Sequence, residues 1–254
     1  MLSAQTVHLT IGDCVLLDNI DVSVDRGELL VVLGPNGAGK SSLLAVLAGM
    51  RLPTSGSVTL DRQSLQSIDS VLKARRLAMF TQQQPLNFSF TVTEVVRLGC
   101  YPLMLDSRGE ERQVDKRLTR LELLAYAERD YLSLSGGEQQ RVQLARVLAQ
   151  VGDETQALLL DEPVSEMDLK HQQLTMTLLR ELARQGVAVI VVLHDLNLAA
   201  QYADRICLLD RGQMIATGTV TEVMTEVRLS ALYQVSVQRI EGATQQPLFV
   251  SSPQ

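Results

Sequence analysis

The segment 34–42 constrains the fold of this chain more than any other, because it reads Gly-Pro-Asn-Gly-Ala-Gly-Lys-Ser-Ser. It holds the pattern G-x-x-x-x-G-K-[ST] between an apolar run, 29–33, and a stretch of helical composition, 42–48. In a strand–turn–helix of this kind, backbone N–H groups and the positive helix N-terminus converge on phosphate oxygens. The pattern predicts binding of a nucleoside triphosphate, with Lys40 at the β- and γ-phosphates and Ser41 on Mg²⁺. The alternative is a Gly-rich turn that binds nothing, which the flanking strand and helix disfavour.

Composition limits the remaining possibilities. With 254 residues, 46% of them hydrophobic, the chain can form one large α/β domain or such a domain with an inserted lobe. A net charge of −6 argues against nucleic acid as a partner. The three scattered cysteines are expected to be buried in a protein of a reducing compartment. No signal peptide is expected, and the longest apolar run, 187–193, is far shorter than the ~20 residues of a membrane span.

Alternating strand and helix patterns predict an α/β fold with a parallel-rich sheet, because apolar strands separated by helices are typical of such sheets. Strands are expected at 6–11, 15–24, 29–33, 57–60, 77–81, 157–160, 187–193, 205–209, 214–217, 235–240 and 248–251. Helices are expected at 42–48, 93–98, 110–128, 138–150, 166–184, 196–202 and 220–232. The first two strands would form an N-terminal antiparallel β-subdomain.

The same pattern predicts one domain, 1–254, in three parts. The phosphate-loop core would comprise 1–81 and 151–218, because strand patterns dominate there. Helical periodicity dominates in 82–150, which indicates an inserted helical lobe. Residues 219–254 would form a C-terminal extension.

Two acidic residues end the apolar run 158–160. Asp161 is suited to hold Mg²⁺, and Glu162 can accept a proton from a water that attacks the γ-phosphate. The alternative is a pair of solvated acids that cap the next helix. The phosphate loop elsewhere in the chain favours the catalytic interpretation.

Two further segments carry candidate site residues. Ser135 is a good N-cap, and Gly136 and Gly137 would let a phosphate approach the amides of the following helix. Without context, this segment could be a capped helix and no more. His194 follows the strand pattern 187–193, where α/β sheets place their sites, so a γ-phosphate contact is favoured over a structural role.

Together, these segments resemble the ATP-binding cassette (ABC) ATPases. The phosphate loop, Gln82, the Leu-Ser-Gly-Gly-Glu of 134–138, the acidic strand end 158–162, Ser-Glu-Met-Asp at 165–168 and His194 occur in the order found in that family. The resemblance covers essentially 1–220, and its signature at 134–138 is highly specific.

The resemblance implies an ATP site with Mg²⁺. The ATP phosphates would be bound by Gly34, Pro35, Asn36, Gly37, Ala38, Gly39, Lys40, Ser41 and Ser42. The implied metal ligands are Ser41, Gln82 and Asp161, and Gln82 would also sense a transmembrane partner.

It also implies a catalytic set and a two-fold dimer. Glu162 would be the catalytic base, with Lys40 and His194 at the phosphates. Ser135, Gly136, Gly137 and Glu138 would contact the γ-phosphate of ATP held by a second copy, and Asp168 would communicate across the dimer.

A finer resemblance is to the ATPase subunits of haem importers. It is carried by Arg-Asp-Tyr at 129–131, by the helix 139–150 and by Leu-Lys-His-Gln at 169–172. Residues 194–200 and 202–205 are similar to the wider group that imports ferric siderophores and vitamin B12.

Three positions bear on how closely the chain follows that group. Glu138 stands where many ABC ATPases have Gln, but this group commonly has Glu, so the departure supports the finer resemblance. A tyrosine that stacks on adenine is missing near Ile11, and Glu166-Met167 replaces a usual small-hydrophobic pair before Asp168. We expect His171 to be a solvated helix residue and not a haem ligand.

The implied assembly is a homodimer beneath two transmembrane permease subunits, served indirectly by a periplasmic substrate-binding protein. The chain would lie at the cytoplasmic face of the inner membrane, as a peripheral subunit without nucleic acid. Ferric siderophore or vitamin B12 is the alternative cargo. A soluble ABC ATPase of DNA repair or translation is the alternative class, although such proteins usually carry a coiled-coil insertion or two cassettes.

Overall fold

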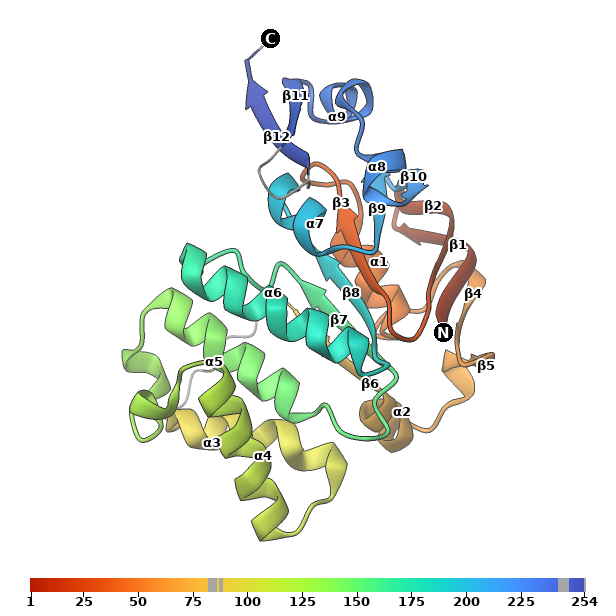
Figure 1. Ribbon diagram of the computed structural model, residues 1–254. Coiled ribbons are helices and arrows are strands. Elements are labelled where there is room, and N and C mark those ends of the chain that lie inside the picture. Colours follow the sequence, from red (N-terminus) through yellow and green to blue (C-terminus); the bar gives the residue numbers. More distant parts are fainter. Residues whose placement is uncertain (82–85, 87–88, 242–246, 254) are drawn as a thin grey trace.

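The computed structural model describes residues 1–81, 86, 89–241 and 247–253 (Figure 1). Its centre is a six-stranded sheet in the order β10-β9-β3-β8-β7-β6. The strands are β3 (Leu29–Leu33), β6 (Leu77–Phe80), β7 (Ala157–Asp161), β8 (Ala188–Val192), β9 (Arg205–Asp210) and β10 (Gln213–Gly218). All neighbours pair in parallel except β10, which is antiparallel to β9. The predicted parallel-rich sheet is confirmed.

Every residue of β3, β7 and β8 is buried, because the sheet is covered on both faces. Two apolar cores result, one on each side. One contains the helical lobe, and the other lies beneath the phosphate-loop helix, α1 (Lys40–Leu47), and the N-terminal strands. Alternate residues of β3, β6, β7, β8 and β9 enter alternate cores, as the period of two requires.

The predicted N-terminal antiparallel β-subdomain is confirmed as a second sheet, in which the strand order is β2-β1-β4-β5 (Figure 1). Its strands are β1 (Leu2–Ile11), β2 (Cys14–Val24), β4 (Ser55–Leu60) and β5 (Gln63–Ser64). After it come a 3₁₀ turn, η1 (Leu65–Ser67), and a helix that was not predicted, α2 (Ser70–Arg76), whose N-cap is Asp69.

The helical lobe lies to one side of the central sheet (Figure 1). It comprises α3 (Val92–Arg97), η2 (Leu98–Leu103), α4 (Ser107–Arg120), η3 (Leu124–Tyr126), η4 (Tyr131–Ser133) and α5 (Gly136–Ala149). The helix predicted at 110–128 is wrong at its end. It stops at Arg120, because Glu122 has a left-handed backbone (φ +55°) and the chain then continues as a 3₁₀ turn.

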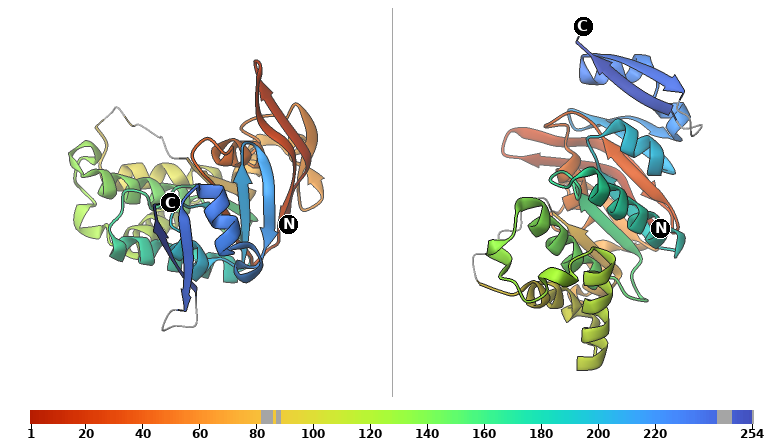
Figure 2. Two further views of the ribbon diagram at one scale, coloured as in Figure 1. Left: turned by 90° about the horizontal axis from the view of Figure 1, so that it is seen from above. Right: turned by 60° about the vertical axis from the view of Figure 1, so that its left-hand side comes forward.

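Two helices complete the core, α6 (Leu169–Arg184) and α7 (Leu196–Tyr202). The C-terminal extension lies at the opposite end of the molecule from the lobe (Figures 1 and 2). It contains α8 (Val220–Val223), α9 (Glu226–Tyr233) and a hairpin of β11 (Ser236–Glu241) and β12 (Pro247–Ser252). The single helix predicted at 220–232 is wrong, because Thr225 has an extended backbone and caps α9.

Two smaller expectations are also tested. Cys100 and Cys207 are buried, but Cys14 is exposed near the turn between β1 and β2, so the expectation of three buried cysteines is wrong there. Within the described ranges, none of the helices has both the length and the apolar character needed to cross a bilayer.

Candidate functional site

The residues predicted to bind phosphate come together where neighbouring parallel strands end. The phosphate loop follows β3. Asp161 is the last residue of β7 and Glu162 comes directly after it, whereas His194 comes two residues after the end of β8. Since β3, β8 and β7 are adjacent in the sheet, their carboxyl ends deliver these side chains to one edge.

Two glycines of the phosphate loop are required by close backbone approach. A Cβ on Gly34 would lie 2.2 Å from the Leu209 carbonyl oxygen, and one on Gly39 would lie 2.7 Å from the Leu16 carbonyl oxygen. Gly37 faces open space and has a φ of +79°. The loop is therefore held tightly against the strands behind it and is open on its outer side.

Lys40 is held inside the phosphate loop. Its side chain is 6% exposed, and Nζ donates to the carbonyl oxygens of Gly34 at 2.8 Å and Pro35 at 2.9 Å. Burial lowers the pKa of Lys40, and the nearby carboxylates of Glu162 and Asp161 oppose that shift. The loop thus contains a desolvated cation where phosphate charge is expected.

Asp161 has the properties of a metal ligand. It is 4% exposed, burial raises its pKa, and a hydrogen bond with Ser41 opposes the shift. Its Oδ1 is buried and has no hydrogen-bond partner among the residues described. A buried carboxylate oxygen without a partner, beside a hydroxyl, is a donor set that suits Mg²⁺. The described residues hold no cluster of three or more His, Cys, Asp or Glu ligands, so a metal here would need phosphate and water oxygens as well.

Glu162 and His194 form a close pair. Glu162 Oε1 lies 2.5 Å from His194 Nε2, and the Glu162 side chain is the more buried of the two. Glu162 also has a left-handed backbone, with a φ of +52°, which is unusual for a residue other than glycine. A conformation of this kind persists only where neighbouring contacts hold it, which agrees with a positioned carboxylate.

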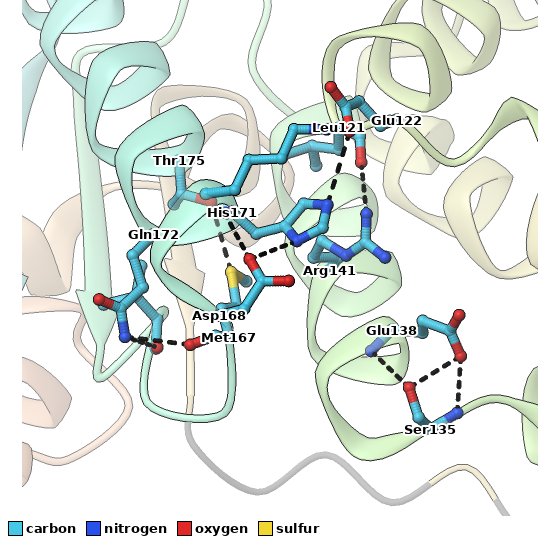
Figure 3. A network of polar contacts seen from close by, with 12 residues as sticks. Leu121, Glu122, Ser135, Glu138, Arg141, Met167, Asp168, His171, Gln172 and Thr175 are labelled. Carbon is cyan, nitrogen blue, oxygen red and sulfur yellow. Dashed lines mark hydrogen bonds and ion pairs between the residues drawn. The ribbon is translucent and has the colours of Figure 1, made fainter.

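The signature segment begins α5 with a capping box (Figure 3). The Ser135 hydroxyl accepts from the Glu138 backbone N–H at 3.4 Å, and Glu138 Oε2 accepts from the Ser135 N–H at 2.8 Å. The Ser135 bonds lower the pKa of Glu138. Within the described part of the chain, no hydrogen bond or ion pair joins this cap to the phosphate loop.

The signature helix is tied instead to the loop that follows Glu162. Gln140 Nε2 donates to the Glu162 carbonyl oxygen at 3.1 Å and to Ser165 Oγ at 3.0 Å, and its Oε1 accepts from the Glu166 N–H at 2.9 Å. A Cβ on Gly137 would lie 2.6 Å from the Glu166 carbonyl oxygen. Packing against this loop is a second reason for glycine in the signature, besides room for a phosphate.

Asp168 begins α6 and belongs to a polar network that reaches the lobe (Figure 3). Its carboxylate accepts from the His171 backbone N–H at 2.9 Å and lies 2.8 Å from His171 Nδ1. His171 Nε2 lies 3.6 Å from Glu122, which also accepts from Lys170 at 2.5 Å. The expectation of a solvated His171 is wrong, because its side chain is 17% exposed and bridges two carboxylates.

Gln82, which the sequence predicts as a metal ligand, lies outside the described residues.

Tyr233, at the end of α9, is a neighbour of the phosphate loop that the sequence analysis does not predict. Its hydroxyl lies close to the Gly34 backbone. Burial raises the pKa of Tyr233 to about 12, and the Gly34 backbone opposes that rise. That hydroxyl has no partner of good hydrogen-bond geometry among the described groups. No motif in the extension indicates this contact with the phosphate loop.

The sequence of this chain is similar to those of known proteins. A family profile described as ABC transporter matches residues 17–165, more than half of the chain. The hemin import ATP-binding protein HmuV of Photobacterium damsela subsp. piscicida is 43% identical over 241 residues, which cover 94% of this chain and 91% of that protein.

Two solved structures are similar along most of their length. An inward-facing, putative metal-chelate type ABC transporter has a TM-score of 0.82 at 26% identity and covers 99% of this chain and 96% of its own. A dimeric, post-hydrolysis ATP-binding cassette bound to ADP and Pi has a TM-score of 0.76 at 28% identity. The match covers 87% of this chain and 99% of that structure's chain.

Proposed function

The chain belongs to the ABC transporter family, and on that premise we propose that it is the ATP-hydrolysing subunit of a haem importer. The observation that carries the catalytic part is the Glu162–His194 pair at the edge of the sheet that holds the phosphate loop. The HmuV relative supports haem as the cargo.

In this proposal, hydrolysis rests on charge placement and one proton transfer. Lys40 binds the β- and γ-phosphates, and His194 orients the γ-phosphate and holds Glu162 in place. Glu162 accepts the proton of the attacking water. Ser41, Asp161 and Gln82 would hold Mg²⁺, which when bound offsets phosphate charge. The buried, unpartnered Oδ1 of Asp161 supports this ligand set.

We further propose that two copies complete two sites. The Ser135–Glu138 cap of one copy would face the γ-phosphate held by the other, with Asp168 near the same contact. A similar solved structure, a dimeric ATP-binding cassette bound to ADP and Pi, supports this arrangement.

The proposed assembly places this dimer beneath two permease subunits at the cytoplasmic face of the inner membrane. A periplasmic substrate-binding protein would deliver cargo to the permease. Within the chain, 1–81 and 151–218 would act as the ATPase core, 82–150 as the inserted helical lobe with the signature segment and 219–254 as a C-terminal extension.

Replacement of Glu162 by Gln tests the catalytic proposal. We expect ATP hydrolysis to fall by about 10²–10⁴-fold with ATP binding retained, since the amide cannot accept the proton. Glu111→Gln, an exposed position on α4, is the matched control. Turnover within a few-fold of the native protein would remove Glu162 as the base.

The cargo is tested by growth on haem as sole iron source in cells that lack this chain. A native copy should restore growth, and the Glu162→Gln copy should not. Import of a ferric siderophore or vitamin B12 is the second candidate, because a similar structure is a putative metal-chelate type transporter. Normal growth on haem without the chain, with loss of siderophore or vitamin B12 uptake, would favour that candidate.

A further inference from the structure

A cavity of about 720 Å³ lies between α4, the segment that precedes β7 and the end of α6. Its walls include Arg75, which precedes β6, residues 151–155, which precede β7, and Val187, which precedes β8. These are the amino ends of parallel strands, whereas the phosphate loop follows a carboxyl end. The cavity is therefore at the opposite edge of the sheet from the predicted ATP site.

The cavity wall is rich in cations, five in all: Arg75, Arg112, Lys116, Arg117 and Arg120. Three acids also line it. Glu154 pairs with Arg75 at 3.6 Å, and Glu181 pairs with Arg120. The third acid is Asp153. Among the residues that the structure describes, it forms no ion pair with the other three cations, Arg112, Lys116 and Arg117. A protein of net charge −6 thus concentrates unpaired positive charge in one hollow.

Arg117 is the most constrained of these cations. It is 4% exposed, and one nitrogen, Nη2, donates to the Val151 carbonyl oxygen at 2.9 Å. Its Nε is buried and has no hydrogen-bond partner among the described residues. Burial and, to a smaller extent, the charge of Arg120 lower the pKa of Arg117 to about 10.

A buried guanidinium is normally paired with an anion, because desolvation of an uncompensated charge is costly. Here the nearby charged groups are mainly of the same sign. The Val151 bond satisfies only one of the five donors of the guanidinium. Among the described residues no acid forms an ion pair with Arg117, so its positive charge at the cavity wall is left without a compensating anion.

We propose that this cavity binds a small phosphate-bearing anion, with Arg117 at its base and Arg112 and Lys116 at its exposed rim. Arg112 and Lys116 are four residues apart on α4, so their side chains lie on one face of the helix. A planar guanidinium presents parallel N–H donors that match phosphate oxygens. The ligand is a free phosphate compound or a phosphorylated lipid headgroup, since both present the same group.

The test is calorimetric titration of inorganic pyrophosphate into the full chain, with one equivalent of ADP per chain to fill the nucleotide site, because excess ADP would itself present phosphate to the cavity. The double variant Arg112→Gln/Lys116→Gln removes the two exposed cations without disturbing the buried Arg117. Arg108→Gln is the matched control, because Arg108 is exposed on the same helix and does not line the cavity. We expect one pyrophosphate per chain in the native protein and the control, and at least roughly tenfold weaker binding in the double variant.

A parallel arm measures sedimentation of the same proteins with phosphatidylglycerol vesicles. Vesicle binding that depends on Arg112 and Lys116, without pyrophosphate binding, supports the site with a lipid headgroup as its ligand. The proposal is overturned if neither probe binds up to about 10 mM, or if the double variant binds as well as the control. The readout is independent of hydrolysis, so failure of the proposed ATPase function would leave this test intact.

Discussion

Gln140 offers a sharp test of how the signature helix is linked to Glu162, the carboxylate that we propose as the catalytic base. Its side chain makes three hydrogen bonds to the loop that follows β7, to Glu162, Ser165 and Glu166. Gln140→Met keeps the length of the side chain and removes all three. At about 0.5–1.5 kcal/mol for each bond, and with water able to replace some at this half-exposed site, the loss is about 1–3 kcal/mol.

Gln139 provides a matched control on the next residue of the helix. Its Nε2 donates to the Tyr131 and Leu134 carbonyl oxygens, both at 3.2 Å and both within the lobe. Gln139→Met should therefore cost about 1–2 kcal/mol without touching the loop after β7. For a chain of this size, each kcal/mol corresponds to roughly 2–4 °C in Tm, so calorimetry can match the two variants in stability.

Turnover separates the two variants. The Glu162 backbone is strained, and relaxation would move its carboxylate away from the attacking water. A displacement that costs about 1.4 kcal/mol in the transition state lowers turnover about tenfold. We expect that loss in Gln140→Met but not in Gln139→Met, from steady-state ATP hydrolysis. Equal turnover in the two variants, at matched stability, would refute the link.

Two further predictions concern the whole fold. Backbone hydrogen bonds at the helix caps lower the pKa values of Asp168 and Glu138 from 3.8 and 4.5. A carboxylate whose pKa is lowered by folding stabilises the fold at pH values above its ordinary pKa. This stabilisation is lost as the pH falls through the pKa of the folded state. The urea concentration at the midpoint of unfolding should therefore decrease as the pH is lowered below 4.5. The decrease should be smaller in Asp168→Asn, because Asn also caps a helix but does not titrate; an equal decrease in the two proteins would contradict this. A thiol reagent should modify only Cys14 in the native chain, because burial raises the pKa of Cys100 to about 11 and of Cys207 to about 12; mass spectrometry that finds all three modified before unfolding would refute this.

The central strands and the phosphate loop could be predicted because their signals are local. A run such as Leu29–Leu33 is buried on both faces, and the glycines that follow it mark the turn. The positions at which helices end were harder to predict. Leu121 and Leu123 continue the apolar pattern of α4, yet they are buried by the turn after the helix and not by the helix itself.

The geometry of the candidate site needed tertiary information. Lys40, Asp161 and Glu162 could be predicted as site residues from motifs. No motif shows, however, that the Gln140 side chain on α5 is hydrogen-bonded to the loop after β7. The environment of His171 was misjudged for the same reason. Its neighbour Glu122 is 49 positions away in the chain and is brought close by the packing of the lobe on α6.

The two-sided burial of the central sheet has a practical consequence for protein engineering. In β3 the odd-numbered residues Leu29, Val31 and Leu33 enter the lobe-side core, whereas Leu30 and Val32 enter the core beneath α1. A combinatorial library confined to the second set would repack the support of the phosphate loop and leave the support of the signature helix unvaried. Because the same division recurs in β7, β8 and β9, the two halves of the ATPase could be evolved in separate rounds of selection and then recombined.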